Sequence, residues 1–337
     1  AEPSLSLGDV DDAFTVLADA AGPGSAARRS AALSGLLGRA TSAEQDFLIR
    51  VLTGEVRTGA LAGVLTDAIA AASGLPEEQV RRAAMLTGDL GGTARSALAG
   101  DDLTGIDLTP GTPVQPMLAA SAPGVREALA VTGPASVEYK LDGARLQVHR
   151  RDGRVRAYTR SLADVTERVP EIVELVSGFP GGDLVLDGET LTLDESGRAR
   201  PFQETMSRFG GHTGPEDRAM LSVSFFDLLY ADARSLIDEP LRVRRAELVR
   251  VAGEAVVRGV EVDGAGREAP DPETAQRVLD EALATGHEGV MIKSLASEYA
   301  AGRRGADWVK VKPVYTYDLV VLAVERGSGR RSGWLSN

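Results

Sequence analysis

The 337-residue sequence contains no cysteine, only three histidines and only four lysines. Without cysteine, these residues can form no disulfide, supply no thiol nucleophile and ligate no zinc through sulfur. The three histidines, His149, His212 and His287, are scattered, which argues against a histidine-rich metal site. No run approaches the roughly 18 apolar residues of a membrane-spanning helix, and the first residues lack the basic-then-apolar order of a signal peptide. These absences predict a cytoplasmic protein that has no membrane partner.

Several common signatures of nucleotide and hydrolase chemistry are also missing. A Walker A loop needs Gly-Lys-Ser/Thr, and no lysine here follows a glycine. No complete G-x-G-x-x-G opens a helix and no G-x-S-x-G elbow is present, which excludes the Rossmann and serine-hydrolase readings. The net charge of −12 argues against indiscriminate coating of nucleic acid. Between residues 303 and 331, however, seven Lys/Arg outnumber three acids, so positive charge is concentrated near the C-terminal end.

The four lysines all lie in short stretches that suit nucleotide chemistry. They are Lys140 in EYKLDGAR, Lys293 in EGVMIKS, and Lys310 and Lys312 in WVKVKP. The 33 arginines (37 Lys+Arg minus 4) supply the ordinary surface cations. Arginine keeps its proton in proteins, whereas a lysine amine can lose it and act as a nucleophile, or stand as a compact charge beside a phosphate. The distribution therefore predicts chemical roles for the lysines.

The pattern of apolar residues changes along the chain. Up to about residue 105, apolar residues recur at three- and four-residue spacings, which predicts an all-α domain over residues 1–108. From about residue 135 strands follow, including RLQVHR and RVRAYTR, joined by a hairpin at Asp152-Gly153. The helix PETAQRVLDEALATG is predicted to end at Gly286. Strands mixed with helices predict an α+β domain with largely antiparallel sheets over residues 109–313. The strand-like YDLVVLAVERG then starts a third domain, residues 314–337.

The stretch from Lys140 to Arg145, Lys-Leu-Asp-Gly-Ala-Arg, resembles the first motif of the covalent nucleotidyltransferases: DNA ligases, RNA ligases and mRNA-capping guanylyltransferases. In the family's order follow YTRS (158–161), LDGE (186–189), FFDLLY (225–230), EGVMIK (288–293) and WVKVK (308–312). The helical region and PVQPMLA ahead of the lysine make the chain similar to ATP-dependent DNA ligases of the archaeal, eukaryotic and actinobacterial type. The resemblance implies a multidomain protein: an all-α DNA-binding domain, an α+β nucleotidyltransferase domain and the start of an incomplete OB-fold.

The resemblance also implies roles for individual residues. Lys140 would attack the α-phosphate of ATP as a neutral amine, giving lysyl-AMP and pyrophosphate. Nearby cations would lower its pKa, and Mg²⁺ would be held by the acids Glu189 and Glu288. The implied nucleotide contacts are Glu138 at the adenine edge, Phe226 stacked on the purine, Arg160 and Glu189 at the sugar, Lys293, Arg304 and Lys310 at the phosphates, and Lys312 as the second cation of the last motif. Arg145 also belongs to the implied nucleotide-binding residues, as a candidate cation beside Lys140 together with Lys310 and Lys312.

The implied partner is nicked duplex DNA, whose 3′-OH and 5′-phosphate a monomeric ligase joins through a DNA-adenylate. Within residues 54–69, Arg57 and the helix start near Gly59 could hold a backbone phosphate, although an exposed arginine at a helix start is an equal alternative. Through residue 110, 15 acids outnumber 8 arginines. We therefore expect DNA binding by the helical domain alone to be weak and strongly sensitive to salt.

Several alternatives stay open on the sequence. Phe226 could be a core residue, Arg160 a salt-bridged surface arginine, and Glu189 part of a turn. An RNA-capping guanylyltransferase or RNA ligase shares the motifs but would not need the helical region. A non-catalytic nucleic-acid-binding protein with a degenerate nucleotide pocket is the rival from another functional class. Zero cysteines favour ATP over NAD⁺ as the nucleotide donor. Because only about 24 residues follow Pro313, we expect a fragment of a longer ligase with impaired activity.

Overall fold

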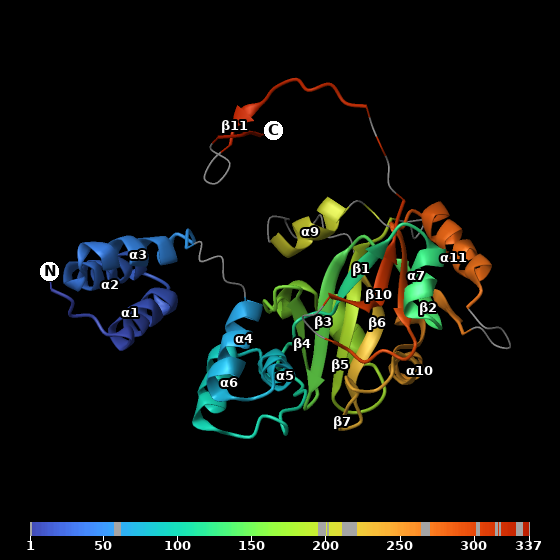
Figure 1. Ribbon diagram of the computed structural model, residues 1–337, viewed down its shortest axis with the longest axis horizontal. Coiled ribbons are helices and arrows are strands. Elements are labelled where there is room, and N and C mark those ends of the chain that lie inside the picture. The colour runs from blue at the N-terminus through green and yellow to red at the C-terminus, as the bar shows by residue number, and fades with distance from the viewer. Residues whose placement is uncertain are drawn as a thin grey trace. The chain divides into compact units, whose positions relative to one another are not determined.

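The structure is a computed structural model that describes residues 2–56, 62–194, 200, 202–210, 221–263, 270–300, 304–313, 316, 318–327 and 333–336. Six helices form the N-terminal part (Figure 1): α1 (Leu7–Asp19), α2 (Ser25–Arg39), α3 (Ser42–Leu52), α4 (Ala62–Ser73), α5 (Glu77–Thr87) and α6 (Leu90–Ala99). Capping boxes start α1 and α3, where Ser6 and Thr41 each accept a backbone hydrogen bond from the acid three residues on. The predicted helical region is confirmed.

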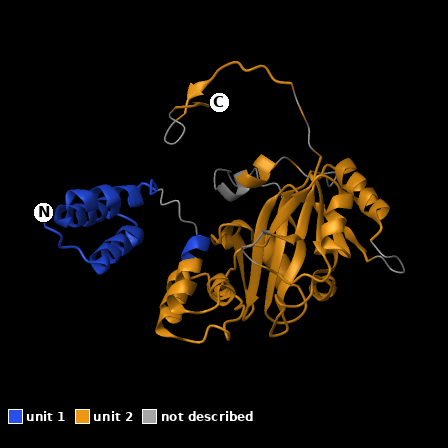
Figure 2. Cartoon of the chain, in the orientation of Figure 1, with its two compact units in different colours: residues 1–65 blue, residues 66–337 orange. Residues whose placement is uncertain are grey.

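The chain divides into two compact units, residues 1–65 and 66–337 (Figure 2). In the first unit, α2 and α3 contribute Leu36 and Leu48 to a small apolar core. In the second unit, Leu86 of α5 joins a core that also contains Met117 and Trp308. The helices α5 and α6 are thus part of the same compact unit as the strands. The domain boundaries expected at 108/109 and 313/314 stay a prediction.

Two five-stranded sheets lie at the centre of the second unit (Figure 1). One has the order β1-β10-β9-β2-β8 and the other β4-β3-β5-β6-β7. The strands are β1 (Leu118–Ala122), β2 (Ala135–Lys140), β3 (Ala144–Arg151), β4 (Arg154–Thr159), β5 (Leu184–Thr192), β6 (Leu221–Ala231), β7 (Arg234–Ser235), β8 (Gly259–Val262), β9 (Gly289–Ser294) and β10 (Arg304–Val311). Their pairings are antiparallel except for β1 and β10, which are parallel. The largely antiparallel arrangement is confirmed.

Helices cover the outer face of each sheet. On the sheet that contains β2, α7 (Val125–Thr132) and α11 (Pro272–Ala284) bury apolar residues against the strands. On the sheet that contains β3, α8 (Pro170–Ser177) and α10 (Leu241–Ala252) do the same. The remaining helix, α9 (Phe202–Gly210), packs near β5. The two inner faces are thereby left to face one another.

Two local predictions from turn chemistry are confirmed. The two-residue turn between β3 and β4 has φ of 50° at Asp152 and 74° at Gly153, the left-handed pair that an Asp-Gly hairpin requires. Helix α11 ends at Ala284, and Gly286 follows with φ of 87°. Glycine tolerates this left-handed conformation without steric penalty.

The predicted strand over residues 317–327 is wrong for most of its length. Residues 318–324 have no regular secondary structure, and only β11 (Glu325–Arg326) pairs, with β12 (Leu335–Ser336). Leu319 and Leu322 are 85% and 93% exposed. Apolar β-branched residues favour a strand only where a neighbouring strand takes their backbone hydrogen bonds, and none does so among the residues described. The expected beginning of an OB-fold stays a prediction.

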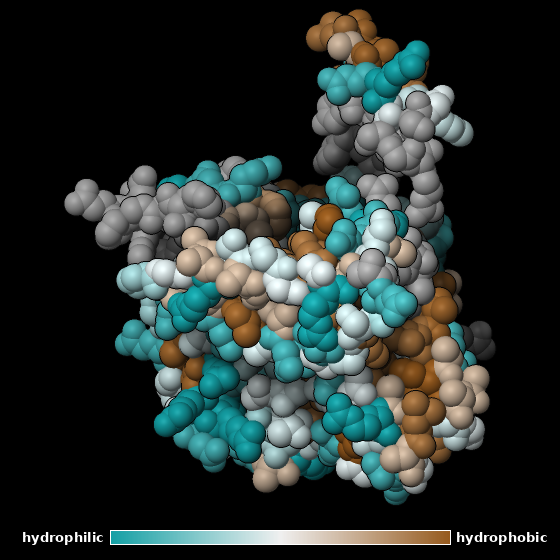
Figure 3. Space-filling model, turned by 90° about the vertical axis from the view of Figure 1, so that its left-hand side faces the viewer, coloured by the Kyte–Doolittle hydropathy of each residue, from teal (hydrophilic) through white to brown (hydrophobic). Residues whose placement is uncertain are grey.

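The surface mixes polar and apolar side chains. On the face drawn in Figure 3, hydrophilic and hydrophobic residues are interspersed. Within the described part of the chain, no helix combines the length and the apolar character that crossing a membrane requires.

Candidate active site

A pocket of about 730 Å³ is lined by residues of both sheets. The lining residues that the sequence singled out are Glu138, Lys140, Arg145, Arg160, Glu189, Phe226, Lys293 and Lys310. Phe202 and Met206 of α9 add an apolar wall, and Met117, Leu118 and Ala119 line it from the start of the α+β region. The sheet pair therefore gathers side chains that lie up to about 190 residues apart in the sequence into one cavity.

Lys140 is the last residue of β2, where it lies opposite Gly289 in the ladder with β9. The backbone N–H of Glu288 donates to the Lys140 carbonyl at 3.1 Å, which holds the two residues side by side. The Lys140 Nζ makes an ion pair with the Glu288 carboxylate, and the Nζ of Lys312 lies 3.8 Å from the other oxygen of that carboxylate. The side chains are 22% (Lys140), 26% (Glu288) and 51% (Lys312) exposed. We call Lys140, Glu288 and Lys312 the outer cluster.

Two motif glycines let the backbones beside Lys140 approach closely. A Cβ on Gly143 would lie 2.1 Å from the Thr190 carbonyl oxygen, and one on Gly289 would lie 2.2 Å from that of Val311. Gly289 also has φ of 148°, which L side chains rarely adopt. The glycines in LDGAR and EGVMIK therefore set the spacing between strands around the lysine.

Glu189 lies on β5 directly opposite Arg145 of β3. Burial raises the pKa of its carboxyl to about 8, against the opposing positive charges of Arg145 and Lys140. The nearby acids Asp187 and Asp142 raise this pKa further. Burial therefore favours the protonated form of Glu189 around neutral pH.

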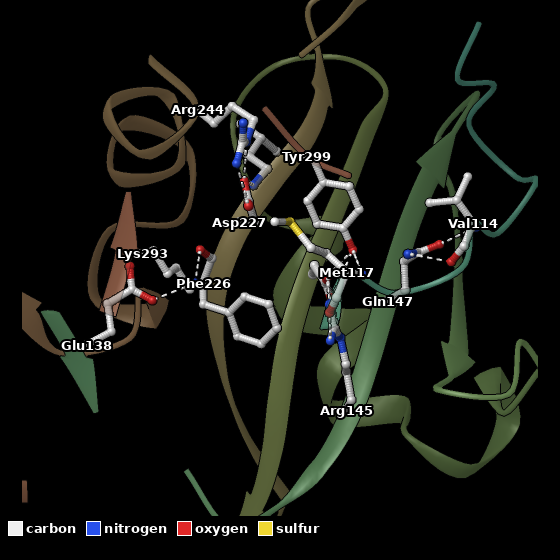
Figure 4. Close-up of polar contacts among 12 residues, drawn as sticks. Val114, Met117, Glu138, Arg145, Gln147, Phe226, Asp227, Arg244, Lys293 and Tyr299 are labelled. Atoms are coloured by element: carbon white, nitrogen blue, oxygen red, sulfur yellow. Dashed lines mark hydrogen bonds and ion pairs between the residues drawn. The ribbon is translucent and has the colours of Figure 1, made fainter. Parts of the chain in front are cut away.

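Arg145 is fixed from three directions (Figure 4). Its guanidinium binds both carboxylate oxygens of Asp187, at 3.0 and 2.6 Å, and donates to the Met117 carbonyl at 2.7 Å. The hydroxyl of the buried Tyr299 lies 3.2 Å from the Arg145 Nη2 and donates to Asp187 at 2.6 Å. Burial lowers the pKa of Arg145, but the nearby Asp187 raises it, and the net shift is upward. Burial raises the pKa of Tyr299. Arg145 is thus a permanently charged part of the pocket wall.

A second set of charges lies at the buried end of the pocket, where Lys293 faces Glu138 (Figure 4). The Lys293 Nζ lies 2.6 Å from Glu138 Oε2, and Arg245 Nη1 lies 2.7 Å from Oε1. The hydroxyl of Ser136 also donates to Oε1, at 2.8 Å. The side chains of Glu138, Lys293 and Arg245 are 1%, 2% and 10% exposed. We call these three residues the inner cluster; burial lowers the pKa of Lys293, opposed by Glu138.

Phe226 of β6 is half-buried in the pocket wall. The Lys293 Nζ lies 4.4 Å from its ring centroid and the Arg145 guanidinium carbon lies 5.2 Å from it. The indole of Trp308 meets the ring edge-on at 5.9 Å between centroids. An aromatic face among cations is compatible with both readings of this residue, a core position and a surface for a purine.

The other sequence-predicted residues have different outcomes. Lys310 and the exposed Arg160 line the pocket. The side chain of Arg304 lies outside the described residues, as do Arg57 and Gly59. The pocket also has lining residues that the sequence reasoning did not single out, among them Thr159 and Ser161 on either side of Arg160.

Comparison with known proteins decides the family. Residues 116–312, which contain every residue of the outer and inner clusters, match the family described as ATP dependent DNA ligase domain. The chain belongs to the ATP-dependent DNA ligase family. Residues 1–70 match a second ligase family, described as DNA ligase N terminus.

Relatives of similar sequence are probable DNA ligases of actinobacteria. The chain is 57% identical over its whole length to one from Pseudarthrobacter chlorophenolicus and 53% identical to one from Saccharopolyspora erythraea. It spans 65% and 64% of the length of these two ligases. Among solved structures, Pmar-Lig_Pre is similar in fold, with a TM-score of 0.50, 22% identity, and coverage of 72% of this chain and 59% of that one.

Some residues at or beside the pocket lie within the quoted motifs although no role was predicted for them. Asp187 stands inside LDGE and Trp308 inside WVKVK, so both were within quoted motifs. Tyr299 and Arg245 had no such signal: the tyrosine lies in a loop, and the arginine is one of three in RVRR on α10. Only the packing of α10 and the 295–300 segment against the strands brings Tyr299 into contact with Arg145 and Arg245 into contact with Glu138, two residues that line the pocket.

Proposed function

We propose that this chain carries the nucleotidyltransferase site of an ATP-dependent DNA ligase, with Lys140 as the residue that becomes adenylated. The observation that carries the proposal is the position of Lys140: it lies at the wall of a cavity large enough for a nucleotide, ion-paired to Glu288 and near Lys312. An ion-paired ammonium is not a nucleophile. Lys140 must therefore leave Glu288 and lose a proton before it attacks.

The proposed reaction has three steps. The Lys140 nitrogen forms a bond to the α-phosphorus of ATP, and the bond from that phosphorus to the β-phosphate oxygen breaks, so that pyrophosphate leaves. An oxygen of the 5′-phosphate at a DNA nick then attacks the same phosphorus, the bond to the Lys140 nitrogen breaks, and the DNA-adenylate forms. Attack by the 3′-OH expels AMP and seals the strand. Phosphoryl transfer of this kind depends mainly on alignment and on neutralisation of charge, which the cations of the pocket supply.

The nucleotide contacts in this proposal follow the pocket wall. Phe226 would stack on adenine, Glu138 would lie at its edge, and Arg160 and Glu189 would lie near the ribose. Lys310 and Lys293 would contact phosphates, with Arg145 held in the wall and Lys312 as a further cation. All of these residues except Lys312 line the one cavity, which supports the assignment.

Mg²⁺ fits the acids of this site. The described residues contain no cluster of three or more histidine or acidic side chains that could hold a metal by themselves. Mg²⁺ usually takes only one or two carboxylates together with substrate phosphates, so Glu189 and Glu288 are a sufficient protein contribution. When bound, the ion would neutralise charge on the phosphates. A nearby dication also favours the ionised form of Glu189, whereas burial favours its protonated form around neutral pH.

The proposed substrate is nicked duplex DNA, bound by a monomer. The proposed domains are 1–108 for DNA binding, 109–313 for nucleotide transfer and 314–337 for the beginning of an OB-fold. The helical region carries 15 acids and 8 arginines through residue 110. We expect residues 1–108 to bind DNA weakly, with an affinity that falls steeply with salt. Tight binding by this region that persists in high salt would contradict the charge argument.

Covalent labelling tests the proposal. The chain is incubated with α-labelled ATP, GTP or NAD⁺ and Mg²⁺, and the label is followed on a denaturing gel. We expect label from ATP that disappears in Lys140→Ala. Label from GTP alone would indicate a capping enzyme. No label, even in a chain extended to the length of its relatives, would indicate a non-catalytic binding protein.

A further inference from the structure

In the inner cluster, the two oxygens of the Glu138 carboxylate accept from different donors. Oε1 accepts from Ser136 and Arg245, both of which have no other role in the proposed chemistry. Oε2 is bound by Lys293 at 2.6 Å. A carboxylate that is 1% exposed has to keep such partners, because an unpaired buried charge is strongly destabilising. Any ligand that displaces Lys293 must therefore offer a donor of its own to Oε2.

The Lys293 ammonium is also buried against two aromatic residues that line the pocket with it. It lies 4.4 Å from the ring centroid of Phe226 and 4.3 Å from that of Trp308, and donates to the Phe226 carbonyl at 3.2 Å. In this position it is fully buried and engaged, so it is not available to a phosphate. Its nitrogen is a hydrogen-bond donor held at once against Phe226 and against Glu138 Oε2.

Like the Lys293 ammonium, adenine can donate a hydrogen bond to Oε2 while lying against the Phe226 ring. Its exocyclic amine is a donor at the edge of a flat ring, whereas guanine has a carbonyl acceptor at the corresponding position. A purine stacked on Phe226 with its amine on Oε2 would replace the contacts that the Lys293 ammonium makes with the Phe226 ring and with Oε2. Guanine in that place would set its carbonyl against a carboxylate oxygen, which is repulsive.

We propose that Lys293 occupies the adenine subsite of the nucleotide-free chain, and that ATP enters by exchanging its exocyclic amine for the Lys293 ammonium on Glu138 while Arg245 keeps the other carboxylate oxygen. The exchange rests on the proposed ATP-dependent function. It releases Lys293 toward the phosphates only when an adenine nucleotide is present. Arg245 is then a positioning residue for base selection. It and Ser136 both donate to Oε1, so Oε2 is the oxygen that accepts from the base.

Arg245 is suited to stay in place during the exchange. It comes from α10, whose neighbouring Arg244 is fixed in a fully buried pair with Asp227 at 2.8 Å and donates to the Ser297 carbonyl at 2.9 Å. The side chain of Arg245 is 10% exposed, and its other acid, Glu261, lies 3.9 Å away. Its guanidinium would keep Glu138 ion-paired after Lys293 has left.

Binding of adenosine, which has no phosphate, separates this exchange from simple phosphate binding by Lys293. Affinities for adenosine and guanosine are measured by calorimetry on the whole chain in the Lys140→Ala background, without Mg²⁺. We expect Lys293→Met and Lys293→Ala to bind adenosine about tenfold more tightly, the effect of removing one competing charge-assisted hydrogen bond. If Lys293 only contacts phosphates, these variants bind adenosine like their parent, and that result overturns the exchange.

Arg245 supplies an independent arm of the test. Arg245→Met should weaken adenosine binding and reduce the preference for adenosine over guanosine, and Arg245→Lys should restore part of both. Loss of affinity for both nucleosides alike, with no rescue by lysine, would reduce Arg245 to a structural residue and overturn its positioning role. Failure of the parent to bind adenosine would overturn the exchange as well. Covalent labelling by ATP judges the ligase proposal separately, because it does not depend on which residue rests in the adenine subsite.

Discussion

The outer and inner clusters each place two cations around one glutamate, but they differ in exposure and in the number of partners of that glutamate. In the outer cluster, Glu288 is 26% exposed and bridges Lys140 and the half-exposed Lys312. In the inner cluster, Glu138 is 1% exposed and is bound by Lys293, Arg245 and the Ser136 hydroxyl. The two carboxylates belong to neighbouring strands or strand ends, since β2 pairs with β9.

This difference separates two uses of an ion pair. An ion pair that water can reach contributes little to stability, so separating it costs little free energy. This suits Lys140, because a nucleophilic lysine must leave its carboxylate partner. A pair removed from water can be broken only if another donor takes the vacated position. The outer cluster is thus suited to the covalent reaction of Lys140, and the inner cluster to selecting the base of the nucleotide that binds.

The largest expected effect is on covalent chemistry in the outer cluster. Lys140→Arg keeps the positive charge but cannot form a neutral nucleophile, so we expect complete loss of label from α-labelled ATP. Lys312→Arg, the matched control on the same carboxylate, should retain measurable label because it supplies only charge. Equal behaviour of the two variants would contradict the division of roles between these lysines.

A smaller effect is expected on the unfolding free energy, which should differ between variants of Glu138 and Glu288. Glu138→Gln removes the ion-pair partner of the buried Lys293 and the nearer acid of Arg245, and should lower the unfolding free energy by about 3–5 kcal/mol. Glu288→Gln removes a partly solvated charge and should change it by less than about 1 kcal/mol. Urea denaturation of the nucleotide-free chain measures both. Equal losses would mean that the burial of the inner cluster has no energetic consequence.

A further effect on stability concerns its pH dependence at Glu189, which lies between an exposed and a fully buried environment. Its pKa is about 8 in the folded chain, above the ordinary value of 4.5 for a glutamate side chain. The folded state therefore holds a proton that the unfolded state releases, and this contribution to stability is lost as pH rises from about 4.5 to about 8. Glu189→Gln cannot ionise, so its stability relative to wild type should rise over this range in urea titrations. Parallel curves would show that burial does not raise this pKa.

Features that depend on neighbouring residues in the chain were predictable. The Asp152-Gly153 hairpin and the end of α11 before Gly286 follow from backbone preferences that act within a few residues. The strand expected over residues 317–327 failed for the opposite reason, because a strand needs a partner that no local pattern can supply. The parallel pairing of β1 with β10 likewise joins segments about 190 residues apart.

The sequence by itself determined the family and the lysine that we expect to react. These depend on residue types in a fixed order. Only the tertiary structure decided which partners surround each charge: Asp187 and Tyr299 around Arg145, and Arg245 beside Glu138. Buried charges must be neutralised by whatever side chains the packing brings within about 3 Å, and that choice is made between elements far apart in the chain.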